Sequence, residues 1–336
     1  MLGFIQVPLL QKVRMLRLLG CSVVLVVVAT AALCSSALSA TIGSPVVVGQ
    51  IPLVEASGLA SSRVHPGIHY THNDSGSGPV VSAITTAGVV KATMTLTSAN
   101  DWEDIAVGPG AGGLSSIYVG DIGDNALNRD RIRVMRIAEP NPLTSAVYTT
   151  QNMQVLDLAY PDGPHNAESL IVDPRTSDLF VVTRSDGPSG TGVGVYRATQ
   201  SFFNQANTGI KQTMSYVTDL PGLTDLRAGD ISPDGRWIVL RNKTDGWLYE
   251  RGENQTIGQA FAGTPVKFQM ISEVQGEAIG WAADGSGFYT TSEGRNQPIY
   301  FYPFAVPEPS SALLLGLGLL ALGGWRVQGS RRFGVR

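Results

Sequence analysis

The chain has 336 residues, enough for one large domain or two ordinary ones, and only 15% of them are charged. The formal net charge is −3, so no basic surplus is available to follow a phosphate backbone, which argues against nucleic-acid binding. Both cysteines, Cys21 and Cys34, lie in an N-terminal apolar stretch. Removal of that stretch would leave no thiol for a disulfide, a metal site or a nucleophile.

The first forty residues have the pattern of a secretory signal peptide. Lys12, Arg14 and Arg17 precede the apolar run LLGCSVVLVVVATAAL, and the small residues of CSSALSA follow it. A basic flank, an apolar centre and a small-residue exit are typical of a signal that is removed after export. We therefore expect residues 1–40 to be cleaved near Ala40, with a retained membrane anchor as the alternative.

The body of the chain, residues 41–305, is a repeat. Five segments each read as a small or acidic residue, an apolar strand, a Gly/Pro/Asp turn, a second apolar strand and a polar turn, as in ISPDGRWIVL at 231–240. The apolar anchors of the five copies are spaced by 46 to 65 residues and are Leu59, Ile105, Leu170, Ile231 and Ile279. A period near fifty residues, with room for four strands, is typical of propeller blades.

The predicted fold is therefore all-β, a β-propeller of about five four-stranded blades, or six if one copy has diverged. A β-sandwich is the alternative, but it does not account for the repeated order of elements. Third strands are expected at 80–84, 132–137, 193–198, 247–250 and 299–304, and fourth strands at 89–96, 147–158, 212–218 and 265–271. The last repeat lacks a fourth strand, so the N-terminal segment SPVVVGQIPLVEA is expected to complete that blade and hide its edge.

The C-terminal segment VPEPSSALLLGLGLLALGGWRVQGSRRFGVR, residues 306–336, resembles the PEP-CTERM sorting signal. It has a Pro-Glu-Pro triplet at 307–309, an apolar helix over 310–325 and a basic end. Sixteen apolar residues fall short of the ~20 that span a bilayer, so a transient anchor with its basic end in the cytoplasm is expected. The resemblance implies export, membrane anchoring through this helix, recognition by an exosortase-type sorting protease, and a final place at the cell surface or outside the cell.

Propeller geometry places the residues that open the inner strands on the same face as those that follow the second strands. Carboxylates from several repeats then meet around a narrow axis, where like charges within ~6 Å raise one another's pKa unless a cation compensates. A hard divalent cation with oxygen ligands, calcium above all, would relieve the repulsion. An arginine-compensated ligand pocket and a network without a ligand are the alternatives.

The predicted metal ligands all open inner strands and are Glu103, Asp104, Glu168, Asp230 and Glu277. The predicted ligand-binding residues surround them and are Asn73, Asp74, Trp102, Asp121, Asp124, Asn125, Arg184, Arg241, Glu293 and Arg295. His72 and His165 are the candidate general bases if the site is catalytic.

Two functions fit these residues. The turns SPDG and AADG resemble those of TolB-like and WD40-like propellers, and the motifs HNDSG and DWEDIAVGP resemble secreted propeller families of unknown function. No nucleophile motif is visible, which favours a binding or structural module of the cell envelope or extracellular matrix, with exopolysaccharide or a surface protein as partner. The alternative is a metal-dependent hydrolase of esters, lactones or phosphoesters, since calcium-dependent lactonases and phytase-like phosphatases have a similar layout.

Overall fold

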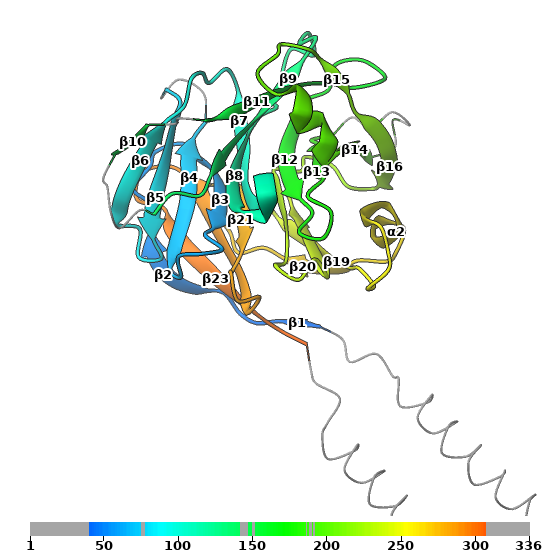
Figure 1. Ribbon diagram of the computed structural model, residues 1–336. Helices are drawn as coiled ribbons and strands as arrows, with labels where there is room; N and C mark the ends of the chain where they lie inside the picture. Colours follow the sequence, from blue (N-terminus) through cyan, green and yellow to red (C-terminus); the bar gives the residue numbers. More distant parts are fainter. Residues whose placement is uncertain are drawn as a thin grey trace, which may run out of the picture. The chain divides into compact units, whose positions relative to one another are not determined.

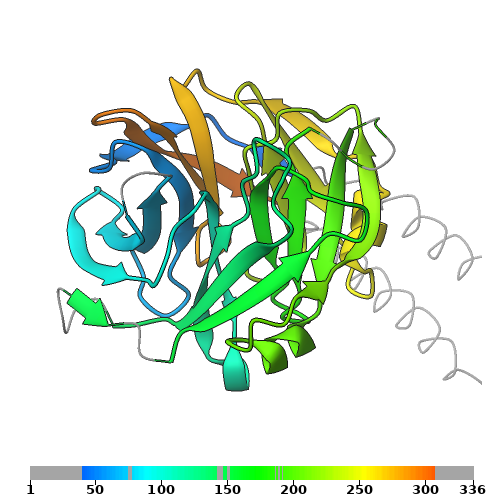
Figure 2. The ribbon, with the colours of Figure 1, turned by 90° about the horizontal axis from the view of Figure 1, so that it is seen from above.

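The computed structural model describes residues 40–306 except 75–77, 142–146, 150–151, 186, 188–189 and 191. Residues Ile42–Ala305 form one compact unit. Its described residues make five sheets arranged around an axis, which is the architecture of a β-propeller (Figures 1 and 2). The predicted signal peptide and tail helix lie outside the described residues. Among the residues that the structure describes, no helix has the length and apolarity that a bilayer crossing requires.

Blade 1 is a four-stranded antiparallel meander with one short addition. Its strands, from the axis outward, are β3 (Ala56–Ser61), β4 (Ile68–Asn73), β5 (Val80–Thr85), β6 (Val90–Thr95) and β10 (Val147–Thr149). The fifth strand, β10, comes from the connection between later strands and pairs with β6 in parallel. The sequence pattern predicts a single strand over 147–158, but the structure divides this segment between two blades.

Blade 2 contains the second part of that segment. Its strands from the axis outward are β7 (Trp102–Pro109), β8 (Ser115–Asp121), β9 (Ile132–Ala138), β11 (Gln154–Ala159) and β15 (Gln212–Thr213). A short 3-10 turn, η1 (Ala111–Gly113), joins β7 to β8. As in blade 1, the outermost strand is a parallel addition from a later connection.

Blades 3 and 4 have four strands each. Blade 3 consists of β12 (Ala167–Val172), β13 (Leu179–Thr183), β14 (Gly192–Ala198) and β16 (Ser215–Pro221), with the 3-10 helix η2 (Gln200–Gln205) before its last strand. Blade 4 consists of β17 (Ala228–Ile231), β18 (Trp237–Arg241), β19 (Asp245–Glu250) and β20 (Val266–Gln269), with the short helix α2 (Ile257–Phe261) before its last strand.

Blade 5 closes the ring. Its inner three strands are β21 (Gln275–Trp281), β22 (Gly287–Glu293) and β23 (Pro298–Ala305). The N-terminal strand β2 (Val46–Gln50) pairs antiparallel with β23, and β1 (Thr41–Ile42) joins the same edge. The predicted closure of the last blade by the N-terminal segment is therefore confirmed. Consecutive inner strands are neighbours and β21 lies beside β3, so the described blades form a closed ring of five rather than a sandwich.

The turn within ISPDGRWIVL shows why the repeat folds as a hairpin. Gly235 has a φ of 71°, a left-handed conformation that glycine adopts without steric cost. The carboxylate of Asp234 accepts the Arg236 N–H at 2.9 Å, which closes the turn. The hairpin thus joins inner strand β17 to β18, as the sequence predicted.

The hydrophobic core lies between neighbouring blades rather than inside any one of them. Tyr118 of blade 2 and Leu170 of blade 3 belong to one buried cluster, and Ile105 of blade 2 and Tyr70 of blade 1 belong to another. Because each blade buries both faces against its neighbours, the inner strands are fixed around the axis, and the residues at their ends are held in place.

Candidate functional site

One face of the propeller collects the starts of the inner strands and the ends of the second strands. The strand registers show this directly, since they pair Ala56 with Asn73, Trp102 with Asp121, Ala167 with Thr183, Ala228 with Arg241, and Gln275 with Glu293. We call this the upper face and the opposite one, where the PDG-type turns lie, the lower face. The upper face is where the sequence analysis expected the acidic residues to meet.

Three glutamates reach the upper face because of β-bulges. The strand register shifts between Trp102 and Asp104, and equivalent shifts occur around Glu168 and Glu277. A bulge re-aims the side chain of its extra residue, which here is Glu103, Glu168 or Glu277. Glu103 and Glu168 lie within hydrogen-bonding reach of each other, and the charge of Glu168 is felt at Glu277. Three distant parts of the chain therefore bring carboxylates together.

Asp104 and Asp230, by contrast, accept hydrogen bonds from backbone N–H groups of the inner strands. The Asp104 carboxylate accepts the N–H groups of Ile105 and of Leu170 in the next blade, both at 2.9 Å. Asp230 likewise accepts the N–H of Ile231 at 2.8 Å and of Trp281 at 2.7 Å. Each carboxylate joins two inner strands, so we do not include either residue in the metal-ligand set that we propose below.

The tightest acidic cluster consists of Asp74, Asp101 and Glu103. One carboxylate oxygen from each residue lies within 4.8 Å of the other two. Calcium binds oxygen at 2.3–2.6 Å, so neighbouring ligands around one ion are separated by distances of this order. Glu103 is only 5% exposed, and the hydrogen-bonding partner of its carboxyl group is another acid, Glu168.

The loop after β8 makes room for this cluster. Fully buried Asp121 accepts the Asp101 N–H at 3.2 Å and forms an ion pair with Arg129 at 2.7 Å. Gly123 donates its N–H to the Asp101 carbonyl at 3.2 Å. A Cβ on Gly123 would collide with the carboxylates of Glu103 and Asp101, so glycine at this position lets both carboxylates keep their present places.

The electrostatics of the cluster favour a cation. Burial raises the pKa of Glu103 well above its usual range, and the charges of Glu168, Asp74 and Asp101 raise it further. Burial and the charge of Asp74 also raise the pKa of Asp101, although Arg129 opposes them. The charged form of this group of residues is thus costly without a compensating positive charge.

The other half of the upper face is compensated by arginine. Arg184 bonds to Glu168 at 2.8 Å and to Asp225 at 2.7 Å. Arg227 bonds to Asp225 at 3.2 Å and forms an ion pair with Glu277. Burial still raises the pKa of Glu277 to about 7. Positive charge is therefore supplied beside Glu168 and Glu277 by Arg184 and Arg227.

The two candidate general bases do not line the acidic cluster. His72 is fully buried, donates from Nδ1 to the Asn73 carbonyl at 2.9 Å, and has a pKa lowered to about 4 by burial. Its ring packs edge-on against Trp102, which is also fully buried rather than at a pocket mouth. His165 Nε2 instead lies 3.2 Å from a carboxylate oxygen of Asp162, and its ring packs against Tyr160 and Tyr196.

Three of the remaining predicted ligand residues are held by hydrogen bonds or ion pairs within the protein. Asp124 accepts the N–H groups of Asn128 and Arg129, and Asn125 accepts from Asn166 at 3.2 Å. Arg241 is fully buried and paired with Glu273 at 2.7 Å.

Three other predicted ligand residues lie on the upper face. Asn73 accepts the Glu55 N–H at 3.1 Å, Glu293 accepts from Gln275, and Arg295 is exposed. Burial and the charge of Asp74 raise the pKa of Glu293.

Asp101 and Arg227 were not predicted. Asp101 had a visible signal, because it lies two residues before Glu103 in the acidic motif DWED, directly ahead of the inner strand. Arg227 had none, since its role depends on the approach of Glu277 from another blade.

Residues 305–332 match the family described as the PEP-CTERM protein-sorting motif. The chain carries a PEP-CTERM sorting motif. That motif marks an exported protein, sorted to the membrane or cell surface and recognised by a processing enzyme of the exosortase type. No curated protein matches the chain. The body in front of the PEP-CTERM motif must therefore be interpreted from its own residues.

Proposed function

We propose that this exported, surface-sorted β-propeller is a binding module that holds a calcium ion on its upper face. The ligands are Asp74, Asp101 and Glu103, and Glu168 lies beside them. The observation that carries the proposal is the close approach of three carboxylates, within 4.8 Å of one another, one of which, Glu103, is nearly buried and has a further acid, Glu168, as its hydrogen-bonding partner. A divalent cation of oxygen preference is the ligand that this arrangement fits best.

The ion would leave room for a partner. Calcium takes six to eight oxygen ligands, and three carboxylates fill only part of that number. Hydroxyl or carboxylate oxygens of an extracellular polymer, or of a neighbouring surface protein, can fill the rest. We therefore propose exopolysaccharide or a surface protein as the partner, bound through the ion.

Binding is favoured over hydrolysis by the positions of the histidines. A general base must lie within hydrogen-bond reach of the water or hydroxyl that it activates. His72 is sealed behind the inner strands, and His165 is bonded to Asp162 and to the Tyr196 hydroxyl, at 2.9 Å from the latter. Neither is placed to activate a water bound to the proposed ion.

Isothermal titration of the full-length protein in detergent with CaCl₂ tests the proposal. We expect one saturable site in the wild type, and its loss in Asp101→Asn. Glu253→Gln, which changes an exposed acid on a turn of blade 4, is the matched control and should bind as the wild type does. Absence of calcium binding to the wild type, or equal binding by Asp101→Asn, would contradict it.

A further inference from the structure

A cavity of about 430 Å³ lies at the lower end of blade 2. It is bordered by Arg136 near the end of β9, by Gln154 at the start of β11 and by Ser116 near the start of β8. Leu114 and Met153 give it an apolar part. The carboxylates of the proposed calcium site lie on the upper face, where Asp101 and Glu103 come from blade 2 and Asp74 from blade 1, so this cavity at the lower end is separate from them.

Arg136 carries a buried positive charge with a neutral partner. It is 4% exposed, and its guanidinium lies 3.7 Å from the centre of the Phe203 ring. Both Nε and Nη2 donate to a single acceptor, Gln154 Oε1, at 2.9 and 2.5 Å. Nη1 is buried without a hydrogen bond of good geometry in the part of the chain that the structure describes, and the hydroxyl of Tyr118, which lies close to the guanidinium, is also neutral. A buried guanidinium normally faces a carboxylate, and here it does not.

No acid is available nearby to take that place. Among the described residues that line the cavity, none is acidic. The sequence from 140 to 153 contains no Asp or Glu. Glu139, the nearest acid in the chain, accepts from Ser115 Oγ at 2.5 Å and from Tyr70 Oη at 3.1 Å. The missing negative charge is therefore not supplied by the adjoining segments.

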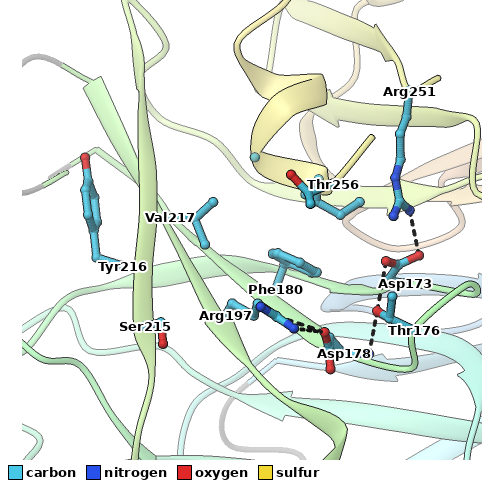
Figure 3. A pocket seen from close by; sticks show the side chains of 12 residues that line it. Asp173, Thr176, Asp178, Phe180, Arg197, Ser215, Tyr216, Val217, Arg251 and Thr256 are labelled. Atoms are coloured by element: carbon cyan, nitrogen blue, oxygen red, sulfur yellow. Dashed lines mark hydrogen bonds and ion pairs between the residues drawn. The ribbon is translucent and has the colours of Figure 1, made fainter. Parts of the chain in front are cut away.

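The cavity between blades 3 and 4 provides a contrast (Figure 3). That cavity, of about 270 Å³, also contains two arginines, but each has a carboxylate. Arg197 pairs with Asp178 at 2.6 Å, and Arg251 pairs with Asp173 at 2.7 Å. Internal ion pairs thus satisfy the arginines there, whereas Arg136 in the blade 2 cavity has no acidic partner among the described residues.

We propose that the blade 2 cavity binds a small hydroxylated carboxylate of the uronate class. The ligand's carboxylate replaces Gln154 and accepts two parallel hydrogen bonds from the Nε and Nη2 of Arg136, the geometry that guanidinium favours. The amides of Asn152 and Gln154 and the Ser116 hydroxyl are donors and acceptors for ligand hydroxyl groups. This inference does not depend on the calcium site.

Isothermal titration calorimetry of the full-length protein with glucuronate, carried out in EDTA, tests the site. Glucose is the matched neutral probe. We expect saturable binding of glucuronate and at least about tenfold weaker binding of glucose, because hydrogen bonds to a charged group are worth roughly this much or more. Equal binding of both sugars, or no binding of glucuronate, would overturn the proposal.

Two variants locate the binding. Arg136→Gln removes the charge and should weaken glucuronate binding about tenfold or more. Gln154→Glu gives Arg136 an internal carboxylate, so it should abolish glucuronate binding while the protein stays folded, as judged by an unchanged or raised melting temperature. Wild-type affinity for glucuronate in folded Gln154→Glu would place the ligand elsewhere and refute the assignment.

Discussion

Glu103→Gln is expected to change stability in opposite directions with and without calcium. In EDTA at pH 8, the substitution replaces a buried carboxyl group whose ionisation is costly beside like charges, so the variant should melt above the wild type. In excess calcium, the wild type gains stability from the bound ion and the variant loses one of the ligands. The order of the two melting temperatures should therefore reverse.

The size of each effect follows from the geometry. Two unit charges at the 4.8 Å limit of the cluster repel by about 3.5 kcal/mol at an effective dielectric constant of about 20. Partial protonation relieves most of this repulsion, so removal of Glu103 should leave a gain of about 1–2 kcal/mol, or about 2–8 °C for a domain of this size. Calcium at about 100 times its Kd should add about 2.7 kcal/mol to the wild type, or about 5–10 °C.

Differential scanning calorimetry of the wild type and Glu103→Gln, each in EDTA and in CaCl₂, gives the four melting temperatures. Glu253→Gln serves as the control and should follow the wild type in both conditions. If Glu103→Gln melts below the wild type in EDTA and responds fully to calcium, Glu103 has a structural role and the cation site is not where we place it.

Three further outcomes are expected. Gly123→Ala introduces a Cβ against the carboxylates of Glu103 and Asp101, so isothermal titration should show a calcium affinity about tenfold or more below that of the wild type. Gly252→Ala, at an exposed turn, should keep the wild-type calcium affinity. Asp230→Asn replaces one of two acceptor oxygens and should lower stability by about 2–3 kcal/mol in urea unfolding, with the calcium response intact; loss of that response would return Asp230 to the ligand set. The pKa of Glu277 is raised from 4.5 to about 7, so the folded state binds a proton that the unfolded chain does not. The contribution of Glu277 to the stability of the metal-free protein should therefore grow as the pH falls from about 7.5 toward 5. Urea unfolding should show a smaller gain over this range in Glu277→Gln than in the wild type, and an identical pH profile in both proteins would exclude Glu277 as a source.

Much of the fold could be predicted because each blade contains a hairpin specified by nearby residues, and this unit is repeated along the chain. Hairpins such as 231–240 carry their own turn chemistry, with Asp234 and Gly235 closing the turn. Five copies then leave one strand missing, and the N-terminal segment was predicted to supply it as β2. The short parallel strands β10 and β15 could not be predicted, since two- or three-residue pairings between connections have no periodicity of their own.

The sequence by itself determined that acidic residues would open the inner strands, and so which end of the ring would be acidic. It did not determine which of two adjacent acids faces the axis. Glu103 and Asp104 are neighbours, yet a bulge turns Glu103 into the cluster while Asp104 bonds to Leu170 in the next blade. Only the tertiary structure decides this, because a bulge depends on strand pairing, and the partner N–H belongs to a strand more than sixty residues away.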